Sequence, residues 1–139
     1  MLNVDGDECW FMSSDTYCQA AVKNVSEVLE KKGIRLPYKC SIPFSNGYHP
    51  EVDTTPELKS DGVQYYQELV GVLRWAIEIG RVDILLEVSL LSSHLALSRQ
   101  GHLEQVMHIF GYLKVHKKLR LMFDSSEPQI SSSRFKSYD

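Results

Sequence analysis

The stretch Tyr66–Trp75, YQELVGVLRW, has the apolar spacing of an amphipathic helix and carries a glycine in its middle. Its apolar face, continued past the quoted residues, comprises Tyr66, Leu69, Val70, Leu73, Ala76 and Ile77. A glycine inside a helix costs roughly 1 kcal/mol relative to alanine, so Gly71 needs a reason. Either a neighbouring element comes too close for a side chain, or something outside the protein approaches the helix there.

Signals at both ends bound this helix. Asp61 stands three residues before Gln64, a pair that resembles a capping box and is expected to open the helix. Gly80 is expected to end it. An earlier helix is expected to begin with Ser14 or Asp15 as its cap and to end at EKKG, with Gly33 just beyond its last turn. Its apolar positions are Cys18, Ala21, Val22, Val25, Val28 and Leu29.

Two further helices follow the quoted stretch. The segment 81–97, RVDILLEVSLLSSHLAL, predicts a third helix with Asp83 in its first turn, where a negative charge is favoured. Ser98 is expected to cap a fourth helix. The apolar face of that fourth helix comprises Leu103, Val106, Met107, Phe110 and Leu113. The chain is therefore predicted to be mainly α, a small bundle of three to four helices.

The remaining segments lack helical periodicity. CWFMSS near the N-terminus and LRLMF near the C-terminus have the composition of strands, and this chain offers few partner strands for them. Four prolines predict a long irregular segment at 34–60. We expect three parts: 1–14 as a strand-like end, 15–124 as the helical region, and 125–139 as a serine-rich, polar, disordered tail.

The bulk composition limits the kind of protein. With 139 residues, 43% of them hydrophobic, the chain can bury one modest core, and its net charge of −3 argues against a strongly basic nucleic-acid binder. Three cysteines without CxxC spacing predict neither a disulfide framework nor a zinc site. Neither a signal peptide nor a membrane-spanning run is present. We expect a soluble, intracellular protein, cytoplasmic or nuclear and not secreted.

The histidines and carboxylates of this chain do not have the spacings of known catalytic or metal-binding motifs. The five histidines, His49, His94, His102, His108 and His116, include no i,i+4 pair and are interpreted as surface or boundary residues. The carboxylates Asp53, Glu57 and Asp61 are better explained by turns and capping than by metal binding. No nucleophile elbow or phosphate-binding loop occurs. The sequence predicts no catalytic residue, no metal site and no cofactor.

Gln67, Gly71 and Trp75, spaced by four, form a stripe about 100–180° around the helix from Tyr66. Two explanations are open. In the first, favoured by the pattern alone, another helix packs into the notch at Gly71 and covers Trp75. In the second, the stripe follows a nucleic-acid groove: Gln67 supplies hydrogen bonds, Gly71 admits close approach, and Trp75 packs on sugars. Arg74 beside the stripe favours a polyanion, and Glu78 does not.

The quoted stretch resembles the first thumb helix of retroviral and retrotransposon reverse transcriptases. In that family a glutamine, a glycine and a tryptophan at this spacing track the minor groove of the template–primer duplex, and Gln67, Gly71 and Trp75 match them one for one. The order of further short motifs resembles the copia-type retrotransposon polyproteins. These motifs are KCSIP (39–43), YYQELVGVL (65–73), Arg81 with Asp83 and Ile84, LLS (90–92), a helix led by His102 that ends in YLK (112–114), and LRLMFD (119–124).

The resemblance covers about Cys9 to Asp124 and implies the thumb and connection region between a polymerase active site and ribonuclease H, with 1–14 the end of a palm region. The Tyr–x–Asp–Asp turn that binds two magnesium ions is absent, as are the acidic ribonuclease H residues, and Val82 stands where copia-type chains commonly carry proline. Two-metal phosphoryl transfer needs such carboxylates. This chain alone is therefore not expected to be an enzyme, and magnesium belongs to the parent polymerase.

The implied partners are an RNA–DNA or DNA template–primer duplex and the remainder of the polymerase and ribonuclease H, with no membrane. The residues expected near nucleic acid are Gln67, Gly71, Arg74, Trp75, Lys114, Lys117, Lys118 and Arg120. The cations at positions 114–120 also suit a helix C-terminus, whose dipole they complement. The alternative is a small helical protein-interaction module with no nucleic-acid role, whose affinity would depend little on salt.

Overall fold

The computed structural model describes residues 2–4 and 7–123, with side chains from Trp10 onward. The strands are β1 (Leu2–Val4), β2 (Asp7–Ser13) and β3 (Arg120–Phe123), and the α-helices are α1 (Asp15–Lys31), α2 (Ser60–Glu78), α3 (Leu85–Ser92) and α4 (Gln100–Val115). Single turns of 3₁₀-helix occur at η1 (Pro50–Val52) and η2 (Val82–Ile84). The prediction of a mainly α bundle with short strands at both ends is confirmed. The predicted tail at 125–139 lies outside the described residues.

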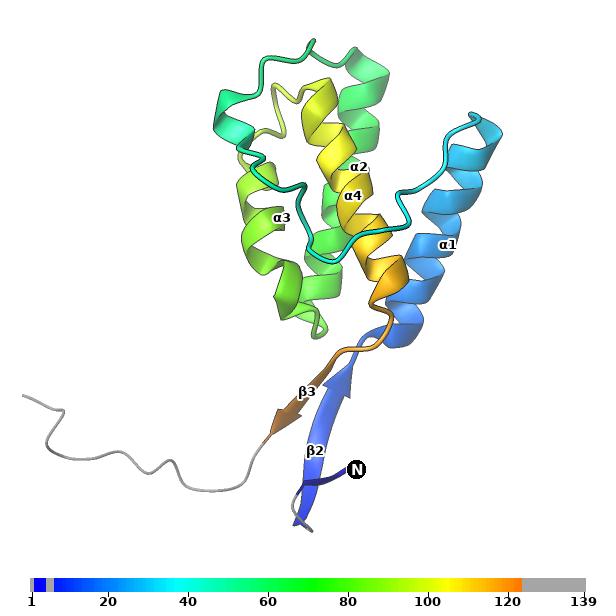
Figure 1. The fold of residues 1–139 in the computed structure, drawn as a ribbon, viewed down its shortest axis with the longest axis vertical. Coiled ribbons are helices and arrows are strands. Elements are labelled where there is room, and N and C mark those ends of the chain that lie inside the picture. Colours follow the sequence, from blue (N-terminus) through cyan, green and yellow to red (C-terminus); the bar gives the residue numbers. More distant parts are fainter. Residues whose placement is uncertain (1, 5–6, 124–139) are drawn as a thin grey trace, which may run out of the picture.

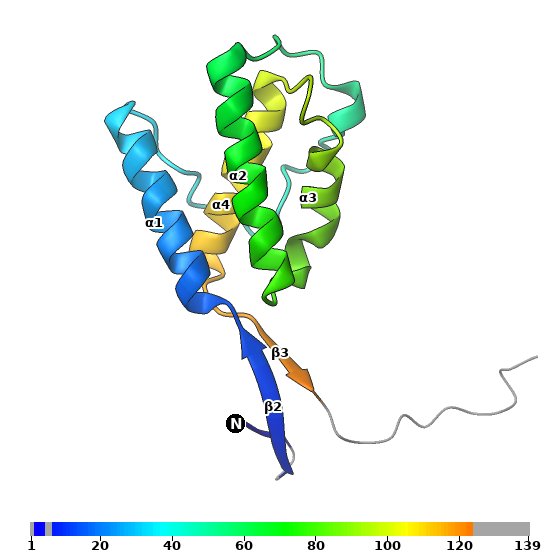
Figure 2. The same cartoon turned by 180° about the vertical axis from the view of Figure 1, so that it is seen from behind.

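Helix α2 lies at the centre of the bundle. Figure 2 shows it nearest the viewer, with α1 on one side, α3 on the other and α4 behind it. Its predicted apolar face is the buried one, since Tyr66, Leu69, Val70, Leu73 and Ala76 lie in the core and Ile77 is partly buried against it. The buried hydroxyl of Tyr66 donates to the carbonyl of Leu91 at 2.6 Å. This bond ties α2 to the end of α3 without leaving a buried polar group unpaired.

The strand fragments at the two ends of the chain pair with each other. β2 and β3 run antiparallel, with Trp10 opposite Phe123 and Ser13 opposite Arg120, and β1 pairs with the other edge of β2. The expectation that the chain offers few partner strands was therefore wrong. It failed because the two fragments lie more than a hundred residues apart in sequence and meet only once the bundle has formed. The ribbon of β2 and β3 projects away from the helices (Figure 1).

A buried ion pair fixes the corner where α2, η2 and the end of α4 meet. The guanidinium of Arg81, 1% exposed, donates to both carboxylate oxygens of Asp83 at 3.1 and 2.8 Å and to the carbonyl of His116 at 2.7 Å. The hydroxyl of Tyr112 donates to the same carboxylate at 2.9 Å, and burial together with this bond raises the pKa of Tyr112. Such bidentate, charge-assisted bonds are among the strongest that side chains make.

The predicted caps of α1 and α2 were wrong in detail. Ser14 does precede α1, but its hydroxyl lies 3.6 Å from the thiol sulfur of Cys18, and the neighbouring hydroxyl, of Ser13, accepts from the backbone of Asp15 at 3.3 Å. α2 begins at Ser60, one residue inside the segment predicted to be irregular. In the part of the chain described, no side chain caps its first residues, so the predicted pair of Asp61 and Gln64 forms no capping box. The helix positions were predictable, but the choice among neighbouring polar residues was not.

The start of α4 is capped by a histidine rather than by Ser98. His102 Nδ1 accepts from the backbone N–H of Arg99 at 3.0 Å, and its Nε2 lies 3.0 Å from the carbonyl of Pro50. Because Nδ1 accepts, the proton of a neutral ring is on Nε2. His102 is 2% exposed, so the interpretation of all five histidines as surface or boundary residues was wrong for this one. The hydroxyl of Ser98 is buried and has no hydrogen-bond partner among the described residues.

The third helix is shorter than predicted. α3 ends at Ser92 instead of reaching residue 97. The hydroxyls of Ser92 and Ser93 donate back to the carbonyls of Val88 and Leu90, at 2.7 and 2.6 Å. Serine hydroxyls that bond to the backbone of their own turn compete with helix continuation, and here they mark its end. His94 then lies beyond the helix and stacks on His102, with ring centroids 4.2 Å apart.

The irregular segment between α1 and α2 runs across α4 (Figure 1). Gly33, which follows α1, has a φ of 72°, as predicted for the residue just after a helix. Asp53 accepts hydrogen bonds from Thr55 and from Tyr48. Burial alone would raise the pKa of Asp53, but these bonds outweigh burial and lower it. The interpretation of Asp53 as a turn residue is therefore confirmed.

Candidate nucleic-acid interface

The stripe of Gln67, Gly71 and Trp75, here called the α2 stripe, faces outward. All three residues are exposed, and the Trp75 side chain is 56% exposed. A Cβ built on Gly71 meets no atom within 4 Å among the described residues. The explanation in which another helix packs into the notch and covers Trp75 is therefore wrong for the described part of the chain. The stripe is available to a partner.

The neighbouring helices leave this face of α2 open because they pack on its flanks. On one flank, the hydroxyl of Tyr17 from α1 donates to the carbonyl of Val72 at 3.2 Å, and the ammonium of Lys32 lies 5.0 Å from the centre of the Tyr65 ring. On the other flank, the side-chain amide of Gln67 donates to the carbonyl of Leu95 at 3.0 Å. That bond fixes the direction of Gln67 and leaves its side-chain oxygen as an acceptor for a partner.

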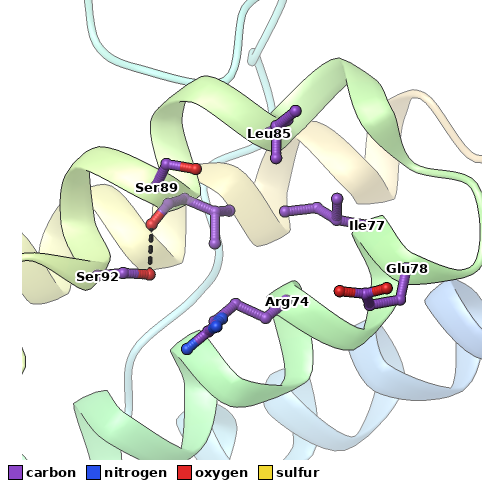
Figure 3. Close-up of a pocket in the computed structure, with 7 residues that line it drawn as sticks. Arg74, Ile77, Glu78, Leu85, Ser89 and Ser92 are labelled. Carbon is purple, nitrogen blue, oxygen red and sulfur yellow. Dashed lines mark hydrogen bonds between the residues drawn. The ribbon is translucent and has the colours of Figure 1, made fainter.

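A pocket of about 310 Å³ lies beside the stripe, between α2 and α3 (Figure 3). Arg74 and Glu78 line it from α2, and Ser89 and Ser92 line it from α3. Within the described residues, the ion pairs shorter than 4.0 Å do not include Arg74. Its charge is thus not neutralised by a close carboxylate, although Glu78 shares the pocket. Arg74 is the one Lys or Arg of α2 and lies three residues from Gly71.

The cations predicted near nucleic acid do not all lie on this face. Lys114 and Lys117 line a groove between α1 and α4, whereas Arg74 borders α3. The two sets therefore line different grooves, one between α1 and α4 and the other between α2 and α3. Lys118 and Arg120 are exposed beyond α4, and the guanidinium of Arg120 lies 5.1 Å from the centre of the Phe11 ring. On α2 the structure places Gln67, Gly71, Arg74 and Trp75 together, whereas Lys114 and Lys117 meet in a separate groove.

Two helical glycines make a direct test of this geometry. A Cβ on Gly111 would lie 2.6 Å from the carbonyl oxygen of Pro37, whereas a Cβ on Gly71 enters open space in the described structure. We expect Gly111→Ala to destabilise the fold by about 1–3 kcal/mol, because the crossing segment must move. Gly71→Ala should stabilise it by about 1 kcal/mol. Urea unfolding followed by circular dichroism measures both, and equal effects of the two substitutions would contradict the assignment of an open surface at Gly71.

Across the described residues, no group of three or more His, Cys, Asp or Glu side chains is arranged to hold a metal ion. No helix in that part of the chain is long and apolar enough to cross a bilayer.

Comparisons with known proteins add no identification. No protein-family model, curated protein or solved structure matches this chain.

Proposed function

We propose that this chain is a thumb- and connection-like region of a copia-type retrotransposon reverse transcriptase, and that α2 binds the template–primer duplex. The observation that carries the proposal is the open space over Gly71 in line with the exposed Gln67 and Trp75. A bare helix backbone allows close approach to a groove, an amide side chain offers hydrogen bonds to base edges, and an indole packs on sugars. The match of these three residues to the thumb-helix motif supports the same role. Polymerisation itself would require the magnesium-binding carboxylates of the parent protein.

The charges on this face set the expected strength of binding. Arg74 is the cation beside the stripe, while Glu68 and Glu78 are exposed on the same helix. Electrostatic attraction for a duplex is therefore modest, and groove contacts must supply much of the affinity. The expected salt dependence is therefore weaker than that of a strongly basic nucleic-acid binder. A weak dependence agrees with the acidic net charge of the whole chain.

Salt dependence tests the proposal. We expect a labelled RNA–DNA hybrid to bind with an association constant that falls with salt at a log–log slope of about −0.9, because one phosphate contact contributes roughly that amount. Arg74→Gln should flatten this slope. Fluorescence anisotropy over a series of salt concentrations measures it. If the folded protein does not bind the hybrid, the proposal is wrong. The function as a small protein-interaction module would then be favoured.

A further inference from the structure

A second candidate binding surface lies between α1 and α4, away from the α2 stripe. Its first part, about 410 Å³, is lined by Lys23 and Ser26 from α1 and by Lys114 and Lys117 at the end of α4. An adjoining part, about 440 Å³, shares Ser26 and Lys114 and continues toward Tyr38. Because the two parts share residues, they form one continuous surface, which we call the α1–α4 groove.

The α1–α4 groove has a charge opposite in sign to that of the whole chain. Lys23, Arg35, Lys114 and Lys117 line it, against the single lining carboxylate of Glu30. Lys23 also lies 4.0 Å from Glu27, but both side chains are largely exposed, and exposed pairs of this kind are weak. In a protein with net charge −3, this concentration of cations predicts an anionic occupant.

One uncharged group narrows the choice of anion. Tyr38, at the far end, is 78% exposed, with the ammonium of Lys39 at 5.8 Å from the ring centre. An exposed aromatic ring beside a cationic groove is the arrangement on which unpaired bases stack.

We propose that the α1–α4 groove binds single-stranded nucleic acid, separately from the duplex on α2. The lysines lie along the phosphodiester backbone, and Tyr38 stacks on a base. An acidic peptide would meet the same charges but would leave Tyr38 without a role. A duplex has no unpaired base to offer Tyr38. The inference uses none of the residues of the α2 stripe, so the two proposals can fail independently.

Binding of labelled oligouridylate, measured by anisotropy at several salt concentrations, tests the inference. We expect Lys114→Gln/Lys117→Gln to lower the affinity at least tenfold and to make the log–log salt slope shallower by about 1.4, since each phosphate contact to a single strand contributes roughly 0.7. Tyr38→Ala should lower the affinity about fivefold or more with little change in slope. The matched control, Lys31→Gln/Lys59→Gln, removes the same charge from exposed positions outside the groove and should leave binding unchanged.

The same variants distinguish binding in the α1–α4 groove from binding of duplex to α2. The groove variants should bind the RNA–DNA hybrid as the wild type does, and Gly71→Leu should bind oligouridylate as the wild type does. The inference is overturned if the folded wild type shows no salt-sensitive binding of oligouridylate, or if the control loses as much affinity as the groove variant. It is also overturned if a polyglutamate peptide binds more tightly than the RNA.

Discussion

Replacing Arg81 by methionine is expected to destabilise the fold by about 3–5 kcal/mol, a large share of the roughly 5–15 kcal/mol that stabilises a domain. Arg81 is the most completely buried charged side chain of the core, and it holds both oxygens of Asp83 and the carbonyl of His116. Its removal leaves the carboxylate with the Tyr112 hydroxyl alone. Urea unfolding followed by circular dichroism gives the change in free energy.

Two controls make the Arg81 experiment specific. Lys23→Met removes a lysine cation from an exposed pair with Glu27 and should change stability by less than about 1 kcal/mol. Arg81→Met combined with Asp83→Leu should recover part of the loss, because no unpaired charge stays behind. An Arg81→Met protein as stable as the Lys23→Met protein would show that the buried pair does not hold this corner of the fold.

The second large effect concerns binding. Gly71→Leu is expected to lower the affinity for an RNA–DNA hybrid by at least tenfold, about 1.4 kcal/mol, without loss of helix. Leucine has a higher helix propensity than glycine, and a Cβ at position 71 meets no atom within 4 Å in the described structure, so we expect the variant to fold. The same side chain would stand where the duplex must approach. Anisotropy titrations measure the affinity, and circular dichroism measures helicity.

A matched variant controls for an added apolar side chain. Asn24 is exposed on α1, a different helix from the one that carries the α2 stripe, and Asn24→Leu should bind the hybrid as the wild type does. If Gly71→Leu bound the hybrid with unchanged affinity while remaining folded, the duplex would not approach α2 at Gly71. The resemblance to the thumb helix would then describe sequence alone.

Periodic patterns predicted the helices well because each buried face follows from local spacing. The predicted apolar positions of α2 and α4 lie in the core or pack against it, although the buried Ile109 was not among them, and Gly33 and Gly80 follow helix ends with positive φ. The caps were less predictable. Several polar residues stand near each helix start, and the choice among them depends on tertiary neighbours: the cap of α4 comes from His102, which the Pro50 carbonyl also contacts.

The candidate site could be predicted only where its residues share one helix. Gln67, Gly71, Arg74 and Trp75 lie on α2, so helical geometry placed them together. Whether these side chains are exposed depends on where α1 and α3 pack against α2. The sequence pattern of α2 does not predict that packing. The α1–α4 groove joins Lys23 to Lys114, ninety-one positions apart in sequence, and the pairing of β2 with β3 is more distant still. Such contacts follow from the folded topology.

Fluorescence of Trp75 tests the binding of duplex to α2 most directly. Trp10→Phe leaves Trp75 as the single tryptophan, because the chain has two. Trp75 is 56% exposed in the free protein, so acrylamide should quench it readily. The account predicts that titration with an RNA–DNA hybrid changes the emission saturably, at the midpoint found by anisotropy, and protects Trp75 from acrylamide. Hybrid binding that leaves both the emission and the quenching of Trp75 unchanged would contradict it.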